Sequence, residues 1–453
     1  MKKVMIGVQL LGVLLLGVLS AGGQTLIKKD AVIESMAAEV NADSLRAYIN
    51  KLVSFGTRNT LSSTTSSTRG IGASREWVVA RFREFAKQSN GRMVVQLDRW
   101  MLQPDKRRID TAVDMGNPMA ILKGTDPDDD RIFVISGHLD SRASNVMNKT
   151  IDAPGANDDG SGVAAVMECA RIMSRQSFPA TILFVAFSGE EQGLFGAAHL
   201  ADSARKNNWN IEAVLNNDIM GSNHSNETNI IDNTKVRVFS EGLPAYELDK
   251  KAVSIRNLGQ ENDGNARQLA RYVKEIGERY VPNLEVVMVY RNDRFLRGGD
   301  HTSFVQQGYT AVRITEMNEN YDHQHQDVRK DKGIQYGDLA EFMDFEYLRK
   351  NTALNLVNLA NLAKSPAQPQ EVRIEVRNLT NSSLLTWKEP KAGKPAGYYV
   401  LVRETYQPFW QKKFFTTQLS MRLPYSKDNY FFAVQSVSQD GNEGLPVLPT
   451  PGR

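Results

Sequence analysis

Three short polar motifs, each lying directly after a hydrophobic segment, carry the side chains of this chain that could do chemistry. They read GHLDS at 137–141, GANDDGSG at 155–162 and FSGEEQG at 187–193. Together they supply a histidine, several aspartates and a Glu-Glu pair. Zinc binds histidine nitrogens and carboxylate oxygens, and a catalytic zinc keeps one position open. The motifs therefore offer the ligands of a zinc site and one spare carboxylate, which a metal-assisted hydrolase can use as its base.

Buried strands and helices alternate around these motifs. The hydrophobic pattern predicts strands within 131–140, 181–191, 213–221 and 310–316, and a helix at 161–175. Such alternation indicates an α/β fold with a mostly parallel mixed sheet flanked by helices. In these sheets, ligands bind beyond the carboxyl ends of the strands. That is where the sequence places four candidate residues, on three separate strands: His138, Glu190, Glu191 and Asp218.

The first residues have the pattern of an export signal. Lys2 and Lys3 precede an apolar run at 4–19, and small residues follow as far as Gly23. This run is shorter than the roughly 20 residues that a membrane span needs. We therefore expect 1–23 to be a signal peptide, and the protein to be periplasmic or extracellular without a stable membrane span.

A linker that reads Ser-Pro-Ala-Gln-Pro begins at Ser365 and divides 24–365 from 366–453. After it, short strands recur at regular spacing, which predicts a β-sandwich. Trp387, the GYYVLVR strand at 397–403 and the aromatic strand before Asp440 resemble a fibronectin type III domain. We expect this C-terminal region to provide a protein or polymer contact, and a folded spacer is the alternative.

Composition excludes some classes of partner. The 453 residues carry a formal net charge of only +3, and lysines and arginines are interspersed with acids, so no nucleic acid partner is expected. The single cysteine, Cys169, forbids an intramolecular disulfide. It lies among apolar residues at helical spacing, which predicts a small buried side chain rather than a nucleophile.

The motifs occur in an order that resembles a known family. GHLDS, PGANDDGSG, FSGEEQGLFG, NNDIMG and a late histidine segment are similar to the zinc-dependent aminopeptidases of the bacterial leucyl aminopeptidase type. Their superfamily also contains glutamate carboxypeptidase and glutaminyl cyclase. The resemblance covers about 40–365 and includes LVSFGTRNT at 52–60. It implies that 24–365 is a zinc peptidase domain, that the chain binds two Zn²⁺, and that its substrates are peptides with a free N-terminus.

The resemblance also implies a ligand for each position. The first zinc is expected on His138, Asp158 and Asp218, with Asp158 bridging to the second. The second zinc is expected on Glu191 and His323, because Asp327 follows His323 by four residues as in the family's late segment. His325 is the runner-up for this position.

Other residues of the motifs are expected to take part in catalysis or to position the metal ligands. The resemblance makes Glu190 the general base that takes a proton from the water shared by the metals. Asp140 is expected to fix the ring tautomer of His138. The remaining candidates are expected on the substrate side or behind the ligands, and they are Asp159, Asp300 and His301.

Three alternatives stay open. A glutaminyl cyclase-like transferase would use a single zinc and nearly the same acids. A carboxypeptidase acting on acidic peptides would need a basic pocket, for which Arg291, Arg294 and Arg297 are candidates. A non-catalytic binding module could share the fold, although Glu190 would then have no use.

Overall fold

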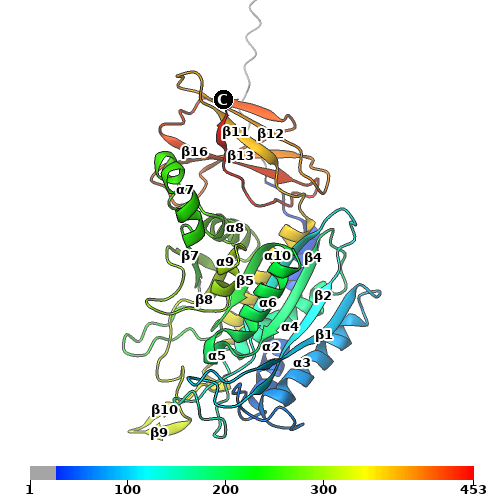
Figure 1. Ribbon diagram of the computed structural model, residues 1–453, viewed down its shortest axis with the longest axis vertical. Coiled ribbons are helices and arrows are strands. Elements are labelled where there is room, and N and C mark those ends of the chain that lie inside the picture. Colours follow the sequence, from blue (N-terminus) through cyan, green and yellow to red (C-terminus); the bar gives the residue numbers. More distant parts are fainter. Residues whose placement is uncertain (1–26, 453) are drawn as a thin grey trace, which may run out of the picture.

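The computed structural model describes residues 27–452, and its centre is an eight-stranded mixed sheet (Figure 1). The expected signal peptide at 1–23 lies outside the described residues. The order of the strands across the sheet is β1-β2-β4-β3-β5-β8-β6-β7. Their bounds are β1 (Met93–Leu102), β2 (Val113–Leu122), β3 (Arg131–His138), β4 (Thr181–Phe187), β5 (Asn210–Asn217), β6 (Lys235–Phe239), β7 (Glu285–Val289) and β8 (Ala311–Glu316).

Helices cover both faces of the sheet. One face carries α1 (Ala31–Ala38), α2 (Ala42–Val53), α3 (Gly70–Ala86), α4 (Gly160–Met173), α8 (Asn265–Tyr280) and α10 (Phe345–Lys364). The other face carries α6 (Phe195–Lys206) and α9 (His301–Gln306). The remaining elements are α5 (Glu190–Gly193), α7 (Ala245–Leu258), the 3-10 turn η1 (Ala340–Phe342) and the hairpin of β9 (Arg329–Asp331) and β10 (Ile334–Tyr336). The predicted α/β fold is therefore confirmed.

The pairing of the central strands determines where functional loops meet. β3 pairs in parallel with β4 and with β5, and β5 pairs in parallel with β8. The carboxyl ends of these four strands consequently lie at one edge of the sheet. Helix α4 begins at this edge, where the side chain of Asp159 accepts a hydrogen bond from the backbone of Gly162.

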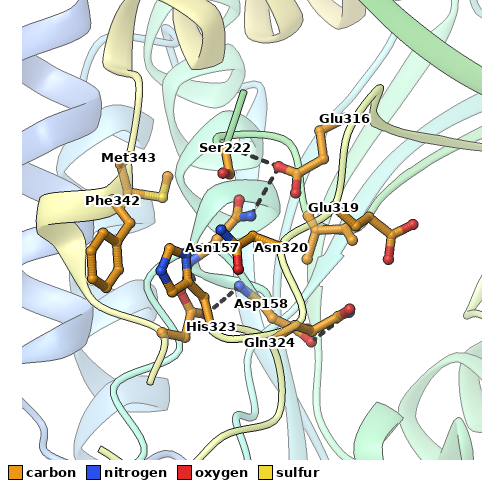
Figure 2. A pocket seen from close by; sticks show the side chains of 12 residues that line it. Asn157, Asp158, Ser222, Glu316, Glu319, Asn320, His323, Gln324, Phe342 and Met343 are labelled. Atoms are coloured by element: carbon orange, nitrogen blue, oxygen red, sulfur yellow. Dashed lines mark hydrogen bonds between the residues drawn. The ribbon is translucent and has the colours of Figure 1, made fainter. Parts of the chain in front are cut away.

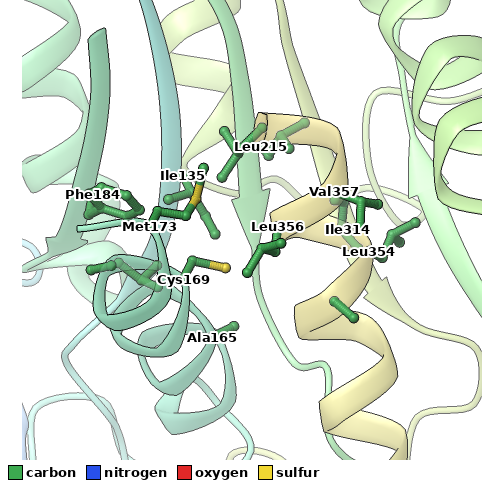
Figure 3. Close-up of a cluster of buried hydrophobic side chains, with 14 of the residues drawn as sticks. Ile135, Ala165, Cys169, Met173, Phe184, Leu215, Ile314, Leu354, Leu356 and Val357 are labelled. Carbon is green, nitrogen blue, oxygen red and sulfur yellow. The ribbon is translucent and has the colours of Figure 1, made fainter. Parts of the chain in front are cut away.

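The main core lies between α4, α10 and the sheet (Figure 3). Figure 3 shows Cys169 on α4 facing Leu356 of α10. Cys169 is fully buried, and burial raises the pKa of its thiol well above the usual range. Cys169 is thus a packing residue, in agreement with the helical spacing around it.

Two small sheets follow α10. Helix α10 ends at Lys364 and β11 begins at Gln370, so the predicted boundary at 365–366 falls between them. One sheet has the order β15-β12-β11-β17 and the other β14-β13-β16. They share an apolar core around Trp387 and Tyr398. The strands are β11 (Gln370–Glu375), β12 (Ser383–Lys388), β13 (Gly397–Glu404), β14 (Lys412–Thr416), β15 (Ser420–Leu423), β16 (Tyr430–Val437) and β17 (Thr450–Gly452).

Buried ion pairs join these C-terminal sheets to α8 and its flanks. Arg403 on β13 donates two hydrogen bonds to Asp263, which also pairs with Arg271 of α8. Glu443 pairs with Arg279 of α8 and with Lys413 of β14. Figure 1 shows the C-terminal sheets at one end of the molecule and α5 with the β9–β10 hairpin at the other.

None of the helices within 27–452 combines the length and the apolar character that crossing a bilayer requires.

Candidate metal centre

His138 is the last residue of β3, and its ring is oriented by the loop that follows. Nδ1 lies 3.0 Å from the carbonyl oxygen of Asp140. A carbonyl only accepts, so Nδ1 carries the hydrogen and Nε2 is the nitrogen that faces the cluster. Nε2 lies 3.1 Å from Asp158 Oδ1 and 3.8 Å from Asp218 Oδ1. His138, Asp158 and Asp218 thus form one group of candidate ligands at the carboxyl ends of β3 and β5.

A second group shares Asp158 with the first. His325 Nε2 lies 3.0 Å from Asp158 Oδ2 and 3.2 Å from Glu191 Oε1. Within each group, the candidate ligand atoms all lie within 4.8 Å of one another. The two carboxylate oxygens of Asp158 therefore face different groups, which is the geometry a bridging carboxylate needs.

The structure corrects the expectation for His323. Its ring stacks on Phe342, with the ring centroids 3.7 Å apart. It lines a small cavity beside Asp158 (Figure 2). Asp327 accepts a hydrogen bond from the backbone of Ser144 instead of serving His323. The segment is a turn in which His325 has a φ of 57°. Spacing rules for regular elements do not apply in a turn, so His325 points to the cluster and His323 points away.

Asp140 acts differently from the expectation. Its backbone carbonyl, rather than its carboxylate, holds the His138 ring. The carboxylate accepts hydrogen bonds from the backbone N–H groups of Gly189, Glu190 and Glu191, at 2.9, 3.1 and 3.1 Å. Thr60 of the LVSFGTRNT segment donates to it as well. Asp140 therefore positions the Glu-Glu pair, as a capping carboxylate does at a helix start.

Glu190 lies partly exposed in a cleft of about 470 Å³ that also contains His138, Asp218 and His325. Burial in this cleft raises the pKa of Glu190 well above its ordinary value, and the nearby Asp218 and Glu191 raise it further. A carboxylate with a raised pKa is suited to accept a proton near neutral pH.

Three predicted residues lie behind the ligands rather than at the cleft. Asp159 is fully buried and accepts hydrogen bonds from the backbone of His138, Gly162 and Ile219. Asp300, just before α9, is also buried, and burial raises its pKa to about 8. Its neighbour His301 completes this buried set, with Nε2 lying 2.7 Å from the carbonyl of Asn292.

Asp218 is held from behind by an arginine. Arg313, on β8, is fully buried and places Nη2 3.0 Å from Asp218 Oδ2. Its other nitrogen, Nη1, pairs with Asp293 at 3.0 Å. Although burial raises the pKa of Asp218, the charge of Arg313 and the contact with His138 outweigh burial and hold it well below the ordinary range.

Asp338 is a supporting residue that the sequence motifs do not indicate. Its carboxylate accepts hydrogen bonds from the backbone N–H groups of Asn157, at 2.9 Å, and Asp158, at 2.7 Å. Figure 2 shows the neighbouring contacts, in which Asn157 and the backbone of Ser222 donate to Glu316. Asp338 follows β10 in a loop without a recognisable pattern, so only the fold brings it to Asp158.

The residues present fit zinc. The donor set is two imidazole nitrogens and three carboxylates, which zinc prefers. Glu191 Oε1 is buried and lies 3.2 Å from His325 Nε2, so a nitrogen and an oxygen ligand are already close together. Burial lowers the pKa of His138, but the surrounding carboxylates outweigh burial and raise it well above the ordinary value. This surplus of negative charge is what a bound cation would neutralise.

Comparisons with known proteins identify the family of this chain. The model of peptidase family M28 matches residues 117–345. A Leptosphaeria maculans protein named "probable zinc metalloprotease" is 43% identical over 421 residues, covering 93% of this chain and 97% of that protein. A Pyricularia oryzae protein of the same name is 44% identical over 430 residues, covering 93% and 85%.

Solved structures show the same fold. The LapA aminopeptidase of Legionella pneumophila has a TM-score of 0.52 at 18% identity, covering 74% of this chain and 76% of that one. An aminopeptidase from Aneurinibacillus has a TM-score of 0.50 at 13% identity, covering 72% and 96%. From the family match and the close relatives together, it follows that this chain belongs to peptidase family M28 and is a zinc metallopeptidase.

Proposed function

We propose that the protein is a two-zinc aminopeptidase that removes N-terminal residues from peptides. The observation that carries this proposal is the position of Asp158 between two groups of ligands, His138 with Asp218 and Glu191 with His325. Glu190 lies in the same cleft and belongs to neither group. The arrangement offers two metal positions and a separate base.

Different residues of the chain would carry out different steps of hydrolysis. Zinc, when bound, polarises the scissile carbonyl and lowers the pKa of water. Glu190 takes the proton of the attacking water and then gives it to the leaving amine. A free α-amine of the substrate would bind at a metal or at a nearby carboxylate of the cleft. Asp140 and Asp338 hold the loops that present these groups.

Two other activities known in the superfamily are alternatives to this proposal. A glutaminyl cyclase-like transferase needs one zinc, whereas the two ligand groups sharing Asp158 favour two. A carboxypeptidase is favoured by one observation, the presence of Arg294 and Arg297 in the lining of the cleft. Arg291 does not line the cleft, and its guanidinium lies over Phe295.

The proposal is tested with aminoacyl-chromophore substrates, each with a free or an acetylated amine, in the presence and absence of a chelator. We expect chelator-sensitive release from the free amines alone, and two zinc ions per chain by elemental analysis. Release from the acetylated substrates would contradict recognition of a free amine. Cyclisation of an N-terminal glutamine peptide without any release would assign the transferase instead.

A further inference from the structure

Four arginines line the metal cleft, and two of them are engaged by the protein itself. Arg294 is partly buried and contacts Asp293 at 3.3 Å, Glu319 at 3.1 Å and Asp218 at 4.0 Å. Arg142 donates hydrogen bonds to the backbone carbonyls of Ala143 and Ser144. These two side chains therefore support the loops of the cleft.

Arg108 has a different environment. It is exposed, and its Nη1 donates a hydrogen bond of 2.7 Å to the backbone carbonyl of Glu191. It forms no ion pair with any carboxylate of residues 27–452. The bond to Glu191 fixes this guanidinium beside the second ligand group and leaves Nη2 available to a ligand.

Arg297 is the second available cation. Its side chain is 34% exposed, and its ion-pair partner in the described chain is Glu319, at 3.6 Å. Glu319 already contacts Arg237 at 2.6 Å and Arg294 at 3.1 Å. One carboxylate thus faces three guanidinium groups, so Arg297 retains uncompensated positive charge.

Among the described residues, no carboxylate that lines the cleft forms an ion pair with Arg108 or Arg297. The lining carboxylates are Asp158, Glu190, Glu191 and Asp218. Three of these carboxylates, Asp158, Glu191 and Asp218, belong to the two ligand groups, where a bound cation would neutralise their negative charge. We propose that Arg108 and Arg297 bind a carboxylate of the substrate, so that the enzyme selects peptides with an acidic group next to the scissile bond. This inference rests on the proposed peptidase function of the same cleft.

Two substrate groups supply such a carboxylate. One is the side chain of an N-terminal Glu or Asp, and the other is a C-terminal α-carboxylate. An arginine fork binds either through charge-assisted hydrogen bonds, which are about twice as strong as neutral ones. Losing such a bond costs roughly 10- to 100-fold in kcat/KM.

The test compares isosteric pairs on the zinc-loaded full chain. Glutamyl and glutaminyl anilides differ only in the charge of the side chain, and N-acetylated dipeptides ending in an acid or an amide differ only at the C-terminus. In the wild type we expect at least a tenfold preference for the charged member of one pair. Arg108→Gln and Arg297→Gln should each lower that preference about tenfold, and Arg297→Lys should restore it only in part, because an ammonium lacks the fork.

Arg107→Gln is the matched control, because Arg107 is an exposed neighbour that does not line the cleft. It removes the same charge and should keep the preference of the wild type. Which pair shows the preference identifies the source of the carboxylate, an acidic N-terminal side chain or the C-terminus.

Calorimetric binding of L-glutamate and L-glutamine gives a readout without turnover. We expect glutamate to bind more tightly to the wild type and to lose that advantage in Arg297→Gln. Equal kcat/KM within both pairs, with equal binding of the two amino acids, would overturn the inference while leaving chelator-sensitive aminopeptidase activity intact. A glutamate preference without release from any free amine would instead refute the aminopeptidase and retain the anion site.

Discussion

Glu190 and Glu191 are adjacent in the chain but lie in different surroundings. Glu191 is buried against His325, whereas Glu190 is partly exposed in the cleft and belongs to neither ligand group. Glu190→Gln should keep both zinc ions and lower kcat by about 10²- to 10⁴-fold, because the amide cannot accept the proton. Steady-state kinetics beside elemental analysis checks this expectation.

Glu191→Gln is the informative companion to that variant. It should lower the zinc content, because Glu191 contributes to the second ligand group. Near-normal kcat in Glu190→Gln would show that another residue is the base.

The two late histidines provide a matched pair of substitutions. His325→Ala removes the nitrogen that lies 3.0 Å from Asp158, so we expect one zinc per chain to be lost and turnover to fall. His323→Ala removes a ring that stacks on Phe342 and should retain two zinc ions. Elemental analysis after gel filtration measures both. Loss of zinc from His323→Ala alone would reverse the assignment.

At the scale of elements, loops from distant parts of the chain support the ligands. The loop after β10 brings Asp338 to the backbone of Asn157 and Asp158, ahead of α4. Groups that orient metal ligands typically contribute 10- to 100-fold to metal affinity. Asp338 is therefore expected to affect zinc binding without touching the metal.

Asp338→Ala tests this support. We expect the zinc affinity to fall roughly 10- to 100-fold. Competition with a chromophoric chelator measures the change. Asp331→Ala, at an exposed position of β9, is the control and should bind zinc as the wild type does. An unchanged affinity in Asp338→Ala would mean that Asp158 is positioned by α4 alone.

At the scale of the whole molecule, the C-terminal sheets are joined to α8 by charges that are buried. Burial raises the pKa of Glu443, but the charges of Lys413 and Arg279 outweigh burial and hold it below its ordinary value of 4.5. A lowered folded-state pKa contributes stability that is present above pH 4.5 and is lost as the pH falls through the folded-state pKa.

Glu443→Gln should consequently destabilise the protein at pH 7, by about 3 kcal/mol, because it removes a buried negative charge that pairs with Arg279 and Lys413. The difference in Tm from the wild type should shrink as the pH falls below about 4.5, because Glu443 is then protonated in the unfolded chain, and the difference should vanish once the pH is below the lowered folded-state pKa. Thermal unfolding followed by circular dichroism between pH 3.5 and 7 measures this. Glu371→Gln, which breaks an exposed pair with Lys388, is the control and should change Tm little. A pH-independent difference would contradict the role of the charge.

Residue types and their order along the chain predicted the α/β fold and the polar residues at the strand ends, and the family resemblance supplied the expected metal ligands. His138 ends β3, Asp218 follows β5, Glu191 lies in the short helix after β4, and Asp158 precedes α4, so all four lie at ends of elements that the hydrophobic pattern indicates. Parallel strands bring their carboxyl ends to one edge, so a strand prediction also places the loops that follow. The C-terminal strands were also predictable from the sequence, because short strands at regular spacing have a strong local signal.

Only the tertiary structure decided between His323 and His325, supplied Asp338 and showed the basic lining of the cleft. These features lie in turns and loops, where side-chain direction depends on backbone torsions and on contacts with distant segments, as the stacking of His323 on Phe342 shows. The buried pairs between α8 and the C-terminal sheets are likewise contacts over long sequence separations, such as Asp263 with Arg403. A sequence determines the elements through local periodicity, whereas the partners of loop residues depend on how those elements pack.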